Sequence, residues 1–253
     1  MSSLTGGSAN THTAMRLLAP ALTFLLLGTI WQLIAFNQTS ILPPLGGVAA
    51  DLAARPGFYL SNLWVTMYAA LVGFALGALL ALLLAATVIH FAFLRAAVIP
   101  VALLLNVTPI VAISPALIVA FGFNAVPHII VAAVAAFFPM LINAMAGLQS
   151  VDPQAMEVFR SMAASRRDIF FRLRLPSSLH FLFSGAKLAI TAAMVGAIVS
   201  EFMGTSHGIG ATIVMATTYL NLKQMWAAIF VSALSTLVLI GLVGLIERAT
   251  IRW

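Results

Sequence analysis

The chain alternates long apolar runs with short polar segments, and six of the runs are long enough to cross a bilayer. A helix rises about 1.5 Å per residue, so about 20 apolar residues span a hydrocarbon core roughly 30 Å thick. Backbone groups that face lipid have no water to bond, so each run is predicted to be helical. The predicted spans are residues 17–36, 62–90, 96–121, 126–148, 185–203 and 225–246. The pattern predicts an all-α polytopic membrane protein in which residues 17–253 form one transmembrane domain.

The positions of Lys and Arg predict how this domain is oriented. If the N-terminus faces the cytoplasm, ten of the twelve Lys and Arg residues lie on the inner side, and only Arg55 and Lys223 lie outside. Such a bias toward the cytoplasm is the rule for membrane proteins, and here it supports an even number of spans. Both termini are therefore predicted to be cytoplasmic. Residues 1–16 are rich in Ser, Thr and Gly and are expected to form a disordered cytoplasmic tail.

The polar segment 149–184 separates the fourth and fifth runs and carries a dense group of charged residues. Asp152 and Pro153 form a favourable helix start, because Asp caps free N–H groups and Pro fits the first turn. Apolar residues then recur at helical spacing on one face, at Ala155, Val158, Phe159, Met162 and Ala163. The opposite face is polar and carries Glu157, Arg160, Ser161 and Ser165.

The amphipathic pattern of this segment leaves two interpretations open. The helix either inserts into a groove on another protein or lies on the lipid headgroups with its arginines toward anionic lipid. A second short helix, from Arg167 to Leu173, is expected to end at Pro176, because Pro lacks the N–H group that would continue it.

The order of residues in this segment resembles the EAA loop of ABC-importer permeases. In that loop a Glu is followed six residues later by Gly and, after ten more, by Ile-x-Leu-Pro; the chain has Glu157, Ala163 and Leu173-Arg174-Leu175-Pro176. Further matching stretches are Ala135–Asn143, Gly147–Pro153, Ser184–Lys187, Val199–Gly204 and Gly208–Gly210. From about Pro43 onward the chain is similar to binding-protein-dependent inner-membrane permeases, in the branch that moves sulfonates, taurine, nitrate, or thiamine and riboflavin precursors.

The resemblance implies a type I ABC-importer permease fold with six transmembrane helices. It also implies a homodimer of this chain, two cytoplasmic ATP-binding subunits that hold ATP and Mg, and an extracytoplasmic solute-binding protein. Carried over residue by residue, it places coupling to the ATPase at Glu157, Arg160, Ser161, Ala163, Ala164, Ser165 and Arg166. Ala163 stands where the family has Gly. Because Ala favours a helix by up to about 1 kcal/mol relative to Gly, an uninterrupted helix is expected there.

Polar side chains and prolines inside the apolar runs are candidates for the translocation path or gate, because such polar groups usually face a cavity or the protein interior. The candidates are Asn106, Thr108 and Pro109 in the third run, Asn143 in the fourth and Glu201 in the fifth. The alternative is local: prolines shape packing, and side chains bond their own backbone or a neighbouring helix end. Gly208 and Gly210 indicate a tight outer turn before a short helix at 211–218.

Two smaller features of the apolar runs have structural interpretations. Lys187 is expected to reach the cytoplasmic headgroups with its charged end. Gly73 and Gly77 form a G-x-x-x-G pair, which allows close helix packing either between two copies or within the chain.

Composition limits the class of function. The chain is 62% hydrophobic and 7% charged, whereas a soluble domain carries about 25% charged residues, so a water-surrounded globule is excluded. It has no cysteine, no H-E-x-x-H motif and no G-x-x-x-x-G-K-S/T phosphate loop. We therefore predict a transport subunit rather than an enzyme, with no metal, cofactor or nucleic acid bound by this chain. A secondary transporter or channel is the main alternative, and an intramembrane enzyme a less favoured one.

Overall fold

The computed structural model describes residues 7–38 and 41–251, which form helices joined by turns and loops, without a strand. The helices are α1 (Gly7–Asn37), α2 (Leu45–Ala54), α3 (Pro56–His90), α4 (Ala92–Val107), α5 (Ile110–Phe121), α6 (Ala125–Gln149), α7 (Pro153–Ser161), α8 (Arg166–Asp168), the π-helical η1 (Ile169–Arg174), α9 (Leu175–Glu201), α10 (Ile209–Thr218) and α11 (Leu222–Thr250). The predicted all-α class is confirmed.

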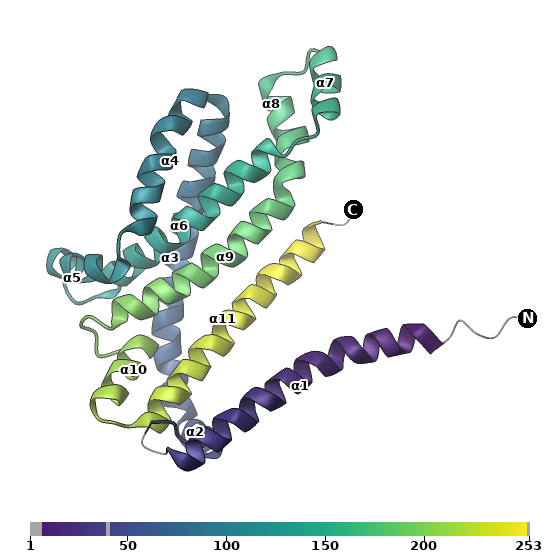
Figure 1. The fold of residues 1–253 in the computed structure, drawn as a ribbon. Coiled ribbons are helices and arrows are strands. Elements are labelled where there is room, and N and C mark those ends of the chain that lie inside the picture. The colour runs from purple at the N-terminus through teal and green to yellow at the C-terminus, as the bar shows by residue number, and fades with distance from the viewer. Residues whose placement is uncertain (1–6, 39–40, 252–253) are drawn as a thin grey trace, which may run out of the picture.

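Five of the described helices are long and apolar enough to cross a membrane, and the count becomes six if the bent pair α4–α5 forms one span. Each of the six apolar runs overlaps one of these helices or that pair. Figure 1 shows α7 and α8 at one end of the molecule and α2 and α10 at the other. The short helices outside the apolar runs therefore mark two opposite ends of the bundle.

The core of the bundle consists of α3, α6 and α9, which approach closely because small residues line their contacts. Lipid provides no hydrophobic force between helices, so their association depends on van der Waals contact, which Gly and Ala permit at short range. A Cβ atom at Gly73 would lie 2.5 Å from Ala132 Cβ, and one at Gly77 would overlap the Ala133 carbonyl group. The G-x-x-x-G pair therefore packs α3 against α6 within the chain.

The third apolar run is divided, because α4 and α5 meet at a bend of 94°. Pro109 has no N–H group to continue helical hydrogen bonding, and the residue before a Pro is kept out of the helical region. Thr108 accordingly has an extended ψ of 124°. Its hydroxyl and N–H groups both donate to the Leu104 carbonyl, at 2.6 and 3.1 Å. The span expected over 96–121 thus becomes two helices in different directions.

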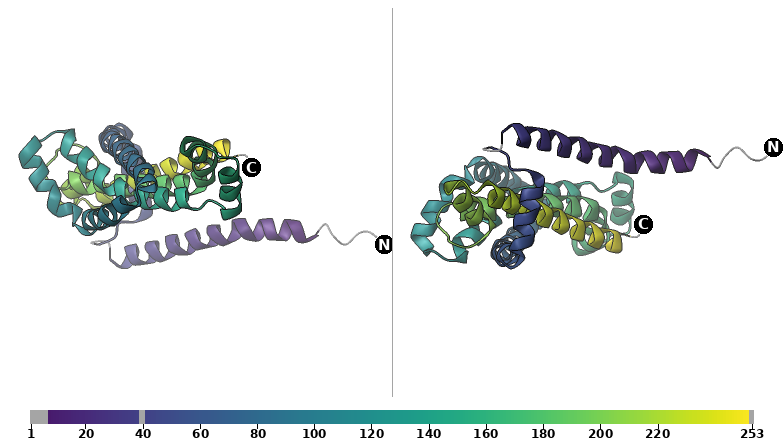
Figure 2. Two further views of the ribbon diagram at one scale, coloured as in Figure 1. Left: turned by 90° about the horizontal axis from the view of Figure 1, so that it is seen from above. Right: turned by 90° about the horizontal axis from the view of Figure 1, so that it is seen from below.

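Helix α1 lies beside the bundle and makes little contact with it, as both views in Figure 2 show. It is attached near its C-terminal end, where the Trp31 ring packs edge-on against Trp226 of α11 with centroids 4.5 Å apart. The Trp31 indole N–H also donates to the Pro43 carbonyl at 3.0 Å. The chain leaves the apolar surface of α1 uncovered, so lipid or another subunit must cover it.

The beginning of α1 differs from the disordered tail expected over residues 1–16. The helix starts at Gly7, because no Pro or Gly interrupts residues 8–19. Residues 1–6 lie outside the described ranges.

An ion pair ties α11 to α9. Lys187 was expected to reach the headgroups, but its ammonium group pairs with the carboxylate of Glu247, 60 residues further along the chain. Both side chains are partly buried, and a charge at this depth is stabilised by an opposite charge. The Glu247 carboxylate, and not a lipid headgroup, is therefore the partner of the Lys187 ammonium group.

Replacing Gly77 by Ala is expected to destabilise the purified protein by about 1–3 kcal/mol, because the added methyl group would overlap the Ala133 backbone. Gly241→Ala in α11 is the matched control, since a Cβ atom there meets no other atom within 4 Å. The fraction of protein that stays monodisperse in detergent after heating measures the effect. Equal loss in the two variants would contradict the proposed α3–α6 contact.

Candidate functional site

Helix α7 extends from one end of the bundle as a short amphipathic helix (Figure 1). It begins as predicted, with the Asp152 carboxylate accepting a hydrogen bond of 3.1 Å from the Gln154 N–H group. Val158 and Met162 are apolar, yet they expose 56% and 75% of their area. An exposed apolar side at a polar end of the molecule is typical of a surface that a partner covers.

The polar side of α7 offers charges that the chain itself does not neutralise. Neither Glu157 nor Arg160 forms an ion pair with any residue in the described ranges. The Ser161 hydroxyl donates to the Val158 carbonyl at 2.8 Å, which keeps it on its own helix. Glu157 and Arg160 thus remain available for charges on another molecule.

Ala163 ends α7, contrary to the expectation of an uninterrupted helix. Its φ is +52°, in the left-handed region. The Ala164 N–H donates to the Phe159 carbonyl and the Ala163 N–H to the Arg160 carbonyl, both at 3.0 Å, which is the Schellman pattern of a helix C-terminus. A left-handed residue at this position is usually Gly, because Gly has no Cβ to clash. The turn therefore explains why Gly would suit this position, and helix propensity was the wrong criterion.

The segment after this turn is continuous with α9. The Ser165 side chain caps α8, accepting from the Asp168 N–H at 3.2 Å and donating to the Asp168 carboxylate at 2.5 Å. The expected end of a separate helix at Pro176 is wrong, because η1 leads directly into α9 with Pro176 in its first turn. A π-helical turn widens the hydrogen-bonding pattern just before the Pro, which allows the ring to be accommodated.

Arg174 connects this segment to the core. Its guanidinium group donates a hydrogen bond of 2.8 Å to the Leu148 carbonyl at the C-terminal end of α6. Cations at a helix C-terminus satisfy free carbonyl groups and interact favourably with the helix dipole. Together with Arg160 and Arg166, Arg174 lines a shallow polar pocket beside the end of α3.

The structure separates the candidates for the path. Asn106 and Pro109 are exposed in the α4–α5 region, where Thr108 bonds its own helix. Asn143 is half-buried, packs near Gly185 and donates to the Pro139 carbonyl of its own helix at 2.8 Å. These side chains do not converge on one cavity within the single chain.

Glu201 is buried and holds the start of α10. Its Oε2 accepts from the Gly210 N–H at 2.8 Å and from the Thr66 hydroxyl at 2.9 Å. The Ile209 N–H donates to the Thr66 hydroxyl oxygen at 2.8 Å. The Gly208 N–H donates to Asn62 Oδ1 at 2.9 Å. Three consecutive N–H groups at this helix start, which have no intrahelical partner, are thus satisfied by α3 and α9.

The glycines of the outer turn have distinct roles there. Gly208 has φ +109°, and a Cβ atom on it would overlap the Glu201 carboxylate. A Cβ atom on Gly210 would overlap the Ile198 carbonyl. Sequence reasoning identified the glycines and Glu201 but missed Asn62 and Thr66, whose spacing of four places them on one face of α3.

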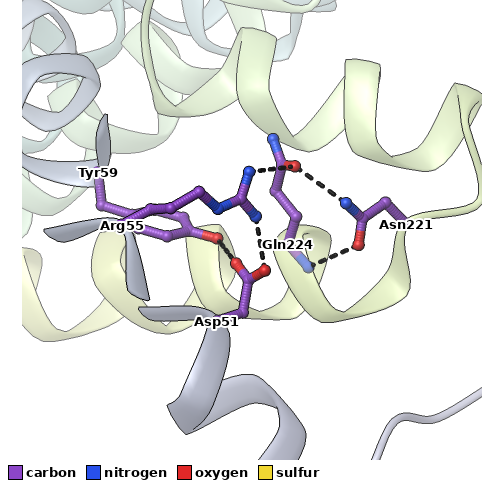
Figure 3. A network of polar contacts seen from close by, with 5 residues as sticks. All are labelled: Asp51, Arg55, Tyr59, Asn221 and Gln224. Atoms are coloured by element: carbon purple, nitrogen blue, oxygen red, sulfur yellow. Dashed lines mark hydrogen bonds and ion pairs between the residues drawn. The ribbon is translucent and has the colours of Figure 1, made fainter. Parts of the chain in front are cut away.

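A polar network lies near this turn, at the end of the bundle that carries α2 (Figure 3). Asp51 accepts hydrogen bonds from Arg55 at 2.5 Å and from the Tyr59 hydroxyl. Arg55 also donates to Gln224 Oε1 at 3.3 Å, and Asn221 Nδ2 donates to the same oxygen at 3.1 Å. The spacing of four from Asp51 to Arg55 was a signal in the sequence, whereas Gln224 is 169 residues from Arg55.

A cavity of about 500 Å³ opens beside this network. It lies between the start of α3, the outer turn with α10, and the start of α11. Ligand cavities in proteins commonly have volumes of about 300–1,000 Å³ and combine apolar walls with a few polar groups. This cavity has that mixture, with Phe58, Met215 and Tyr219 facing Asn62 and Gln224.

Ala163→Gly is expected to stabilise the turn after α7 by about 1 kcal/mol, because Gly adopts the left-handed conformation without a Cβ clash. Amide hydrogen exchange at residues 163–165 should slow roughly fivefold. Ala164→Gly is the control, since Ala164 does not have a positive φ and should gain nothing. Equal changes in both variants would contradict the left-handed turn.

Gly208→Ala is expected to release the start of α10, because the new Cβ atom would displace the Glu201 carboxylate and strain a residue with positive φ. A cost of about 1–3 kcal/mol corresponds to an increase of roughly 5- to 140-fold in hydrogen exchange at residues 209–212. Gly57→Ala is the control, as a Cβ atom there meets nothing within 4 Å. Unchanged exchange in Gly208→Ala would contradict the role of these bonds.

Comparisons with known proteins agree on one family. The model of the binding-protein-dependent transport system inner membrane component matches residues 73–252. The formylaminopyrimidine transport permease ThiX of Halalkalibacterium halodurans is 28% identical, covering 93% of this chain and 96% of its own. The riboflavin transport permease RibX of Chloroflexus aurantiacus is 32% identical, and the match covers 89% of this chain and 88% of RibX. The putative aliphatic sulfonates transport permease SsuC of Bacillus subtilis is 30% identical, and the match covers 78% of this chain and 71% of SsuC.

The fold agrees with this match. A chain of the MetNI methionine ABC transporter, solved in inward-facing conformations, superposes with a TM-score of 0.56 at 18% identity, covering 77% of this chain and 93% of that one. The exposed helix α7, the bundle of α3, α6 and α9 and the sequence match point the same way: the chain belongs to the family of binding-protein-dependent transport inner-membrane components and is an ABC-importer permease, a transport subunit rather than an enzyme.

Proposed function

We propose that two copies of this chain form the membrane path of an importer for a small organic solute or anion of the sulfonate, nitrate or vitamin-precursor class. Two ATP-binding subunits, which hold ATP and Mg, bind on the cytoplasmic side, and an extracytoplasmic solute-binding protein delivers the solute. The observation that carries the proposal is α7, whose apolar side is exposed and whose Glu157 lacks an ion partner among the described residues. Family membership supports the same arrangement.

In this proposal α7 and the turn that follows it dock into a groove of the ATPase. The exposed Val158 and Met162 would fill the groove, and Glu157, Arg160 and Arg166 would meet polar groups at its rim. The small residues Ala163, Ala164 and Ser165 leave room for the partner's backbone. Docking accounts for both faces of α7, whereas a helix lying on headgroups would turn its apolar face into the bilayer.

The rest of the chain provides a mechanical connection from α7 to the opposite end. The η1 segment continues into α9, and Arg174 links it to α6. Helix α9 has 27 residues, so it is about 40 Å long, and its last residue Glu201 holds the start of α10. Motion of α7 with the ATPase would therefore reach α10 through a single rigid helix.

The proposed path runs past the break between α4 and α5, with Asn106, Thr108 and Pro109 near its inner surface in the dimer. A break in a spanning helix is tolerated where it lines a cavity or is covered by protein, because its free backbone groups then find partners. Asn143 and Glu201 act as positioning residues for the inner and outer gates. The inner side in this proposal is the side of α7, which agrees with the excess of Lys and Arg there.

Glu157→Arg is expected to abolish docking, because it reverses the charge on the polar side of α7. Co-purification of the ATPase subunit and ATP-driven uptake should both fall at least tenfold, while the dimer remains monodisperse. Lys223→Glu, which changes the net charge by the same magnitude at the opposite end of the bundle, is the control and should leave co-purification unchanged. Normal assembly and uptake in Glu157→Arg would overturn the proposal.

A further inference from the structure

The geometry points to the cavity between α3, α10 and α11 as a binding site for an uncharged, planar heteroaromatic solute. The inference rests on the proposed function and names the substrate class that such a permease would carry. Three properties of the cavity support it: its aromatic walls, its set of unused hydrogen-bonding groups and its lack of charge.

Two aromatic side chains provide flat surfaces for a ring. Tyr219 directly follows α10 and is 77% exposed, and Phe58 is 38% exposed. Phe58 is held in place, because its ring packs edge-on against Tyr59 and Arg55 lies 5.5 Å from its centroid. Aromatic rings stack in offset or edge-on geometries that favour planar ligands, and a fixed ring loses little freedom when one binds.

The hydrogen-bonding groups of the cavity are oriented by the surrounding chain. Gln224 Oε1 already accepts from Arg55 and Asn221, so the side-chain amide N–H groups of Gln224 are the ones that remain without a described partner (Figure 3). Both ends of the Asn62 amide are used, by the Gly208 N–H and the Phe58 carbonyl. The cavity therefore offers Gln224 as a neutral, directed donor, which suits a ring nitrogen or ring carbonyl.

Further neutral groups lie in the same cavity. The Tyr219 hydroxyl and the His207 ring form no hydrogen bond with other residues in the described ranges, and both can donate or accept. Heteroaromatic rings carry alternating donors and acceptors at their edges, so a mixed set of neutral partners matches them.

The cavity is poorly suited to an anion. No Asp, Glu, Lys or Arg lines it. Arg55, which contacts the lining residues Phe58 and Gln224 from behind, is paired with Asp51, and the Lys223 side chain packs against Gly47 of α2. A sulfonate or nitrate would lose its water without a cation to replace it, whereas an uncharged ring pays a much smaller desolvation cost.

The cavity is also connected to the outer gate. Asn62 lines the cavity and at the same time accepts the hydrogen bond from Gly208 at the start of α10. A solute that contacts Asn62 and Tyr219 therefore touches the hydrogen-bond partner of Gly208, just before α10, and the residue that directly follows α10. Occupancy of the cavity would thus influence the helix that α9 controls.

The test uses the full chain in lipid nanodiscs and saturation-transfer NMR with a 4-aminopyrimidine, riboflavin and taurine as probes. The two ring compounds should receive saturation from the protein, and taurine should receive none. Tyr219→Ala, which removes the stacking surface, and Gln224→Glu, which replaces the donor by a charged acceptor, should each weaken the ring compounds at least tenfold. Phe123→Ala, an equally exposed aromatic outside this cavity, is the control and should bind normally.

The following results would overturn the inference. Equal saturation of taurine, displacement of the pyrimidine by millimolar nitrate, or unchanged binding in Tyr219→Ala and Gln224→Glu would exclude this site or this class of solute. ATP-driven uptake of taurine or nitrate by the assembled complex, without binding of either ring compound, would remove this inference alone and leave the proposed function intact. Failure of Glu157→Arg to affect assembly would instead remove the proposed function.

Discussion

A backbone N–H or C=O group inside a bilayer has no water to bond, and the rest of this structure depends on that constraint. Long uninterrupted helices satisfy it internally, and specific partners are needed wherever a helix starts or breaks. At the start of α10, Asn62, Thr66 and Glu201 provide three such partners. At the α4–α5 break, the side chain of Thr108 adds a second bond to its own helix. At these two irregular points, polar side chains inside apolar runs supply the partners that the interrupted helices lack.

The second constraint is the distance at which helices pack. Without a hydrophobic force between helices in lipid, α3 can hold α6 only by close contact, and Gly77 allows its backbone to approach Ala133. Helix α1 makes no comparable contact within the chain and is attached mainly through Trp31. The rigid part of the molecule is thus α3, α6 and α9, and the parts that remain for partners are α1 and α7.

A closely packed core of α3, α6 and α9, with α1 and α7 left for partners, suits a transport cycle. Helix α9 connects the segment after α7 to the start of α10, so the two ends of the bundle share one element. The cavity beside α10 shares Asn62 with the same connection. In the proposed importer, ATPase motion carried by α9 and solute binding beside Asn62 of α3 would therefore both act on the start of α10.

The sequence alone determined the apolar runs, the all-α class, the capped start of α7 at Asp152 and the resemblance to permeases, because hydrophobic length, capping and motif spacing are local properties. Tertiary structure alone decided that Lys187 meets Glu247 and that Glu201 lies against Thr66, 135 residues away. Headgroup attraction favoured another outcome for Lys187. The left-handed turn at Ala163 is local, since its hydrogen bonds go to Phe159 and Arg160, and helix propensity was the wrong local criterion for it. The physical reason is that a buried polar group is placed by partners distant in the chain, and no local pattern encodes which partner will be near.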